Sequence, residues 1–124
     1  MKPLEKYTFG VGDRFAHQAS AQLDAFIQAR RQGWEVVPVW NKSNREHLTV
    51  DSQPPSVLAA AQAAVKAADW RHGFHIDADH IGIATVEPFL ACSDFFTLDV
   101  ADSIGKPAPA RELDAFVTQH RSLI

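Results

Sequence analysis

The sequence predicts an α/β protein built on a parallel β-sheet. Two observations carry this prediction: short apolar runs of strand-forming residues alternate with longer segments of helical periodicity, and the alternation occurs four times. The 124 residues are 46% hydrophobic and 22% charged, which is enough apolar material for one folded domain over residues 1–124. We therefore expect four consecutive βα units that share a core.

The first unit is a strand over residues 7–11 followed by a helix. A loop over residues 13–17 joins them. Apolar residues between 21 and 29 then recur with the helical period of about 3.6. Gly33 ends the helix as a C-terminal cap, because glycine readily adopts the left-handed conformation found there.

The second unit begins with the apolar run 34–39, which reads as a buried parallel strand. A polar loop is expected over residues 41–47. Pro54 and Pro55 mark the start of the next helix, since proline is tolerated in a first helical turn. The alanine-rich segment 57–68 forms the body of that helix, because alanine is the strongest helix former.

The last two units are shorter. A third strand is expected over 73–78, and Thr85 is expected to be the N-cap of a short helix over 86–90. A fourth strand follows over 95–100. The segment 109–123 is predicted to be the last helix. Its apolar face comprises Leu113, Phe116 and Val117.

Composition argues against several classes of function. A formal net charge of −3 is unsuited to a nucleic-acid surface. No stretch approaches the ~20 consecutive apolar residues that span a bilayer, and the first residues lack the apolar core of a signal peptide. The single cysteine, Cys92, fits a reducing compartment, and we expect it to be a small buried hydrophobe. The sequence predicts a soluble cytoplasmic protein with no nucleic-acid or membrane partner.

Polar residues stand at the carboxyl end of every predicted strand. In parallel α/β folds ligands bind there, because loops and helix N-termini meet at that edge of the sheet. Between residues 72 and 105 the chain has no lysine or arginine but six carboxylates. Clustered carboxylates repel one another, and a bound divalent cation relieves the repulsion. The pattern therefore indicates a metal-binding rim.

The segment Asp77-Ala78-Asp79-His80 is the centre of this prediction. Asp77 and Asp79 lie two residues apart in a strand, so they face the same side, while His80 extends into the loop above. A carboxylate beside an imidazole suits zinc, manganese, iron or nickel. The structural alternative makes Asp77 a turn or capping residue and His80 a surface histidine.

The few cations near this rim favour an anionic substrate. Arg14 is suited to a bidentate grip on a carboxylate, although an internal ion pair with Asp13 is the structural alternative. Lys42 and Arg45 are either substrate contacts or solvated charges. His47 is a further candidate ligand for a metal or a substrate.

Four stretches of the sequence together resemble the tagaturonate epimerase family. They are FGVGDRFAHQ (9–18), VWNKSNREH (39–47), DADHIG (77–82) and FFTLDVAD (95–102). Their order along the chain is the one expected of the family. The resemblance implies a metal-dependent isomerase on a (βα)-barrel scaffold, which interconverts tagaturonate and fructuronate in hexuronate breakdown.

Carried over to the matching positions, the resemblance implies roles for single residues. Asp79 would be the proton acceptor and His80 a metal ligand. A divalent cation would polarise the ketone of an open-chain uronate while a carboxylate removes a proton. The residues implied to line the substrate site are Asp13, Arg14, Lys42 and Asp77.

The chain is shorter than the scaffold that the resemblance implies. An eight-stranded barrel typically needs ~250 residues, so four βα units correspond to half of a TIM-type barrel, the N-terminal half of a longer enzyme. The remaining metal ligands and a proton donor would lie in the other half, and this chain alone would be inactive. The open sheet edges would favour pairing with a second copy, a homodimer.

Two other interpretations remain open. The chain could be a non-catalytic half-barrel or a flavodoxin-like module that binds a metal or a sugar acid. It could also be a metal-dependent aldolase, since one scaffold hosts many reactions.

Overall fold

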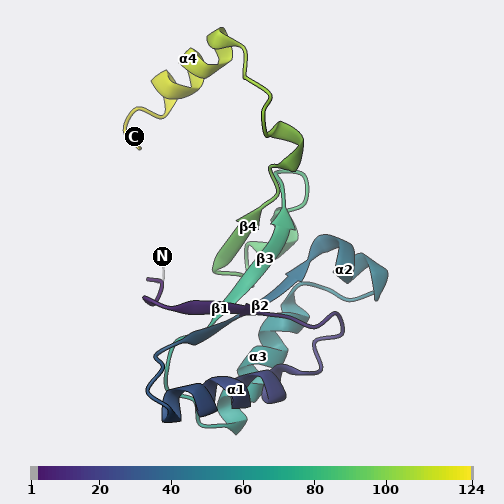
Figure 1. Cartoon of the computed structure of the whole chain (residues 1–124). Helices are drawn as coiled ribbons and strands as arrows, with labels where there is room; N and C mark the ends of the chain where they lie inside the picture. The colour runs from purple at the N-terminus through teal and green to yellow at the C-terminus, as the bar shows by residue number, and fades with distance from the viewer. Residues whose placement is uncertain (1–2, 124) are drawn as a thin grey trace.

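The structure confirms the parallel α/β architecture (Figure 1). The computed structural model describes residues 3–123. Its sheet has the order β1-β2-β3-β4, and every neighbouring pair is parallel. Strands that follow chain order are consistent with part of a barrel, whereas a flavodoxin-like sheet places its second strand at the edge. The elements are β1 (Thr8–Val11), α1 (Ala19–Arg31), β2 (Val37–Ser43), α2 (Asn44–Thr49), α3 (Pro55–Ala67), β3 (His75–Ile81), the 3₁₀ turn η1 (Glu87–Phe89), β4 (Phe95–Leu98), the 3₁₀ turn η2 (Ala101–Ser103) and α4 (Ala110–Gln119).

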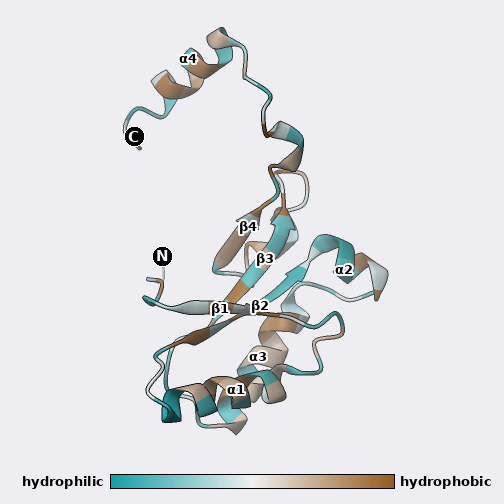
Figure 2. Cartoon of the chain, viewed as in Figure 1, coloured by the Kyte–Doolittle hydropathy of each residue, from teal (hydrophilic) through white to brown (hydrophobic). Residues whose placement is uncertain are grey.

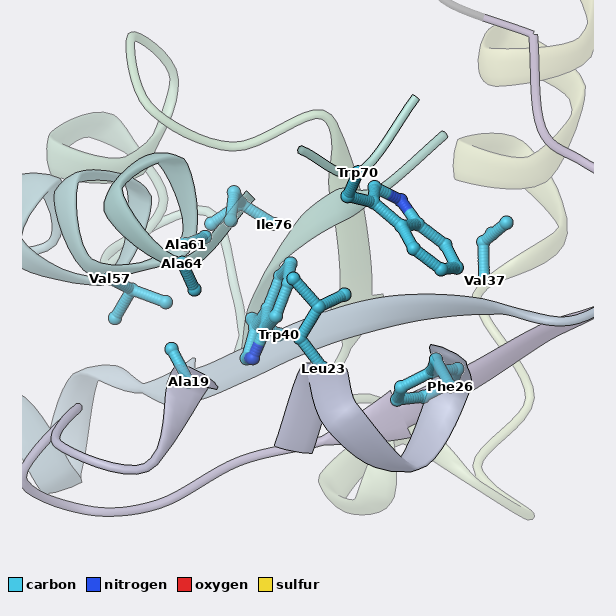
Figure 3. Packing of buried hydrophobic residues seen from close by; sticks show 10 residues of the cluster. All are labelled: Ala19, Leu23, Phe26, Val37, Trp40, Val57, Ala61, Ala64, Trp70 and Ile76. Carbon is cyan, nitrogen blue, oxygen red and sulfur yellow. The ribbon is translucent and has the colours of Figure 1, made fainter. Parts of the chain in front are cut away.

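The core lies between the sheet and the two long helices α1 and α3 (Figure 3). Leu23 and Phe26, about one turn apart on α1, point into it. Ala61 and Ala64 on α3 are also buried, and their small side chains leave room for Trp40 of β2. Burying one large apolar side chain stabilises the fold by roughly 1.5–3 kcal/mol. This cluster therefore holds the sheet and its helices together.

The buried tryptophans keep their polar atoms hydrogen-bonded. Trp40 Nε1 donates to Gln22 Oε1 over 2.9 Å, and Trp70 Nε1 donates to the Gly73 carbonyl over 3.0 Å. Both rings can thus be buried without leaving an N–H group unpaired.

The second strand differs from its prediction. Residues 34–36 precede β2, and Trp34 is 66% exposed. The strand instead continues to Ser43, because residues 41–43 pair with residues 77–79 of β3. The predicted loop over 41–47 is therefore wrong, since its second part forms helix α2. A capping box starts that helix: the Ser43 hydroxyl accepts from Glu46 N–H, and the Glu46 carboxylate accepts from Ser43 N–H.

Other boundaries shift by a few residues. β3 continues past its predicted end at residue 78 to Ile81, and β4 ends at Leu98 instead of residue 100. The predicted N-cap at Thr85 is wrong, because its hydroxyl bonds to the backbone of Gly82 in a turn. Only the 3₁₀ turn η1 follows it. Gly33 has φ +91°, as the predicted helix cap requires.

The last helix stands away from the sheet (Figure 1). α4 covers most of the predicted segment 109–123, but none of its residues is buried. The predicted apolar residues Leu113, Phe116 and Val117 all remain exposed. Within residues 3–123 no helix, α4 included, is long and apolar enough to cross a membrane.

Candidate functional site

The carboxyl ends of the strands form the candidate site. All four strands run in one direction, so their carboxyl ends lie along one edge of the sheet. Figure 2 shows that β2 becomes hydrophilic where it approaches α2. The register pairs Asn41 with Asp77 and Ser43 with Asp79 on neighbouring strands. Polar groups of two strands are therefore brought side by side, as predicted.

Asp79 and His80 lie at an irregularity of β3. Between the pairs Ala78–Phe96 and Ile81–Leu98, β3 advances three residues while β4 advances two, which is a β-bulge. His80 has φ +51°, a conformation that non-glycine residues seldom adopt. Its side chain is 62% exposed, and His80 Nε2 lies 3.8 Å from Asp79 Oδ1. Bulges and strained backbone of this kind are frequent at functional sites, where they redirect a side chain.

Asp77 fastens β4 to β3. Its two carboxylate oxygens accept hydrogen bonds from Thr97, one from the backbone N–H over 3.0 Å and one from the hydroxyl over 2.7 Å. Burial raises the pKa of Asp77, and the nearby Asp79 charge adds to this, against the two Thr97 hydrogen bonds. Asp77, which was predicted to bind substrate, thus makes a structural contact with β4 beside the site.

Asp13 organises the loop that carries Arg14. Its carboxylate accepts the backbone N–H groups of Phe15 and Gln18, over 2.9 and 2.8 Å, and so holds the turn before α1. Arg14 lies near Glu46, with Nε 3.9 Å from Oε1, and is 56% exposed. Its guanidinium group is accessible to an anion, whereas both Asp13 oxygens already have partners.

Lys42 is buried on the helix side of the sheet. It is 1% exposed, and its Nζ donates to Ser52 Oγ over 2.8 Å. Burial lowers the pKa of Lys42, although Glu46 and Asp13 oppose the shift. The Lys42 ammonium group is thus directed toward Ser52, with almost no exposed surface through which to contact a substrate in this conformation.

His47 shares the Ser52 hydroxyl with Lys42. Its Nδ1 lies 2.9 Å from Ser52 Oγ, and its ring packs edge-on against Phe89. Burial, together with the positive charge of Lys42, lowers the pKa of His47 to about 4, so the ring is neutral at pH 7. Its Nε2 has no hydrogen-bond partner among residues 3–123.

His75 forms a second polar cluster at the opposite end of β3. Its Nε2 lies 2.6 Å from Glu5 Oε2, and its Nδ1 lies 3.1 Å from Asp94 Oδ2. A Cβ atom on Gly73 would collide with the Glu5 carboxylate, so a larger residue there would displace Glu5 from His75. The sequence offered no local signal for this cluster, because its residues lie far apart in the chain.

Cys92 is buried, as predicted. Its Sγ donates to the Phe89 carbonyl over 3.5 Å, and burial raises the pKa of the thiol. A protonated thiol is a poor nucleophile, which agrees with the predicted packing role.

The described residues do not form a complete metal site. Within residues 3–123 no group of three or more His, Cys, Asp or Glu side chains is placed to hold an ion. Asp79 and His80 supply two donors, whereas a catalytic zinc-like ion usually has three protein ligands. A carboxylate and an imidazole are suitable ligands for a divalent transition metal, but two ligands are fewer than such an ion usually has.

Comparison with known proteins identifies the family. A family model described as tagaturonate epimerase matches residues 2–123. This chain belongs to the tagaturonate epimerase family. A solved structure of fructuronate-tagaturonate epimerase from Cohnella laeviribosi shares its fold, with a TM-score of 0.64 and 20% sequence identity. The alignment covers 91% of this chain and 26% of that one, so the chain spans about a quarter of that structure. No curated protein matches the chain.

Proposed function

We propose that this chain contributes the Asp79–His80 part of an active site that interconverts tagaturonate and fructuronate. The observation that carries the proposal is the β-bulge at the carboxyl end of β3 in a tagaturonate epimerase family member. The bulge holds His80 in an unfavourable conformation and leaves it accessible beside Asp79. Such strain persists only where the surrounding structure enforces it.

In this proposal Asp79 is the proton acceptor. A carboxylate at the rim takes a proton from the substrate as negative charge develops on an oxygen of the uronate. Asp79 is only partly exposed, and it neighbours Asp77, whose buried carboxyl has a raised pKa. Arg14 is an accessible cation for the substrate carboxylate, because guanidinium groups bind carboxylates in a bidentate manner.

The metal and the remainder of the site belong to the same proposal. His80 would be one ligand of a manganese, nickel, zinc or iron ion, with Asp79 beside it. When bound, such an ion polarises a carbonyl oxygen. Because no group of three or more ligating side chains is placed together within residues 3–123, we infer that the other metal ligands and a proton donor come from further parts of a longer protein.

The first test compares the 124-residue chain with a chain extended through the downstream reading frame. Epimerisation of tagaturonate is measured with added manganese, nickel or zinc. Activity only in the longer chain is the expected result. Activity in neither chain would contradict the proposed reaction and favour a binding module, while aldol cleavage products in its place would favour the aldolase alternative.

Single substitutions then test the two central residues. Asp79→Asn is expected to lower kcat about 10²–10⁴-fold, the usual contribution of a general base. Asp114 of α4 is exposed and lies outside the carboxylate-rich segment, so Asp114→Asn is the matched control and should leave kcat unchanged. His80→Asn keeps a residue that tolerates positive φ but removes the imidazole. It should weaken divalent-metal binding measured by calorimetry, with His72→Asn as control; unchanged affinity would remove His80 from the metal site.

A further inference from the structure

The two faces of β2 differ at its carboxyl end. Successive residues of a strand point to opposite faces of the sheet. Lys42 points to the helix side, where it bonds to Ser52 before α3. Asn41 therefore points to the other face. The register places it opposite Asp77, with Ser43 and Asp79 forming the next pair on that face.

Gly10 of β1 and Gly12, which directly follows this strand, make room for the Asn41 side chain. A Cβ atom on Gly12 would collide with Asn41 Oδ1, and one on Gly10 would lie 3.3 Å from Asn41 Nδ2. Both glycines therefore lie against Asn41, on the side of the sheet to which its side chain points. The side chain of Asn41 thus occupies a slot that larger residues at these two positions would close.

The Asn41 amide is available for a ligand. It is partly exposed, and it makes no side-chain hydrogen bond within the part of the chain that the structure describes. Its neighbour Asp77 already has Thr97 on both oxygens. Asp79 lies two residues further along β3, which is about 7 Å at ~3.3 Å per residue. A six-carbon chain can extend between these two side chains.

We propose that Asn41 is the residue through which β2 positions the hydroxylated chain of a sugar acid beside Asp79. This inference rests on the proposed function. It assigns the substrate contact on β2 to Asn41 in place of Lys42. An amide carries both a donor and an acceptor, so it pairs with a hydroxyl or a ketone oxygen. Being neutral, it adds no repulsion toward an anionic substrate in a region already rich in carboxylates.

Binding of tagaturonate, measured by calorimetry on both the 124-residue and the longer chain, tests this proposal. Asn41→Ala should weaken binding about five- to tenfold, as expected for the loss of one or two hydrogen bonds, without a change in melting temperature. Asn41→Asp should weaken it further, because the new charge repels the uronate carboxylate. Gly12→Ala should act in the same direction, since its Cβ would collide with both the amide oxygen and the backbone carbonyl of Asn41. Lys42→Met is the control on the other face and should stay within about twofold of wild type.

The outcomes separate this proposal from the proposed function. Unchanged binding in Asn41→Ala, or an equal loss in Lys42→Met, would overturn the role of Asn41 even if the longer chain is active. Absence of tagaturonate binding in both wild-type chains would also overturn it. Binding that depends on Asn41 while neither chain epimerises would support the positioning role and reject the reaction.

Discussion

Helices α1 and α4 are both amphipathic, yet only α1 buries its apolar face. Leu23 and Phe26 of α1 lie in the core, whereas Leu113 and Phe116 of α4 remain more than half exposed. α1 returns to the sheet through a short βα crossover between adjacent strands. A segment with two prolines leads from β4 to α4, which stands away from the sheet in Figure 1. The comparison shows that an amphipathic pattern predicts a helix but does not predict whether the apolar face of that helix is buried.

The largest effect on stability is expected at α1, whose apolar face is buried. Leu23→Ala should lower the free energy of unfolding by about 2–5 kcal/mol, because it leaves a cavity in a core with no exposed surface at this position. Urea denaturation followed by circular dichroism measures the change. A loss below about 1 kcal/mol would mean that the contact between α1 and the sheet contributes less than the packing indicates.

A pH effect should arise from His47, a buried residue of α2. Its pKa is about 4 in the folded chain and about 6.5 when unfolded, so only the unfolded state binds a proton between these values. The contribution of His47 to stability should be constant above pH 6.5 and fall as the pH drops toward 4, by up to about 3 kcal/mol.

Two variants sharpen that expectation. His47→Gln should flatten the pH dependence of urea denaturation between pH 6.5 and 4.5, whereas His17→Gln, at an exposed site, should not. Lys42→Met should raise the pKa of His47 measured by NMR, because the Lys42 charge helps to lower it. An unchanged profile in His47→Gln would assign the acid sensitivity to another group, such as Glu46, whose pKa is lowered mainly by its Ser43 hydrogen bonds against the effect of burial.

The smallest effect is expected on α4. Leu113→Ala removes a side chain that is already 54% exposed, so the free energy of unfolding should change by no more than about 0.5 kcal/mol. The same urea experiment measures it. A loss comparable with that of Leu23→Ala would show that α4 docks in solution, on the sheet or on a second copy, and would remove the contrast between the two helices.

Sequence patterns predicted most of the fold and located the candidate site. Helical periodicity and alanine content identified α1 and α3 within a few residues. The polar strand ends identified the edge where Asp79 and His80 lie. The same polarity led to a wrong prediction for the end of β2. Asn41, Lys42 and Ser43 are polar residues typical of a loop, but in the structure they pair with β3. The family resemblance, now shown by the match over residues 2–123, came from four stretches taken together.

The sequence by itself determined that four βα units form one parallel sheet, because alternating patterns of strand and helix are local and repeat along the chain. Tertiary structure alone decided which polar residues share a face. Register placed Asn41 beside Asp77 and turned Lys42 toward Ser52, and the bulge redirected His80. The physical reason is the two-residue period of a strand: a shift of one position reverses every side chain, and no local pattern in a polar segment specifies that shift.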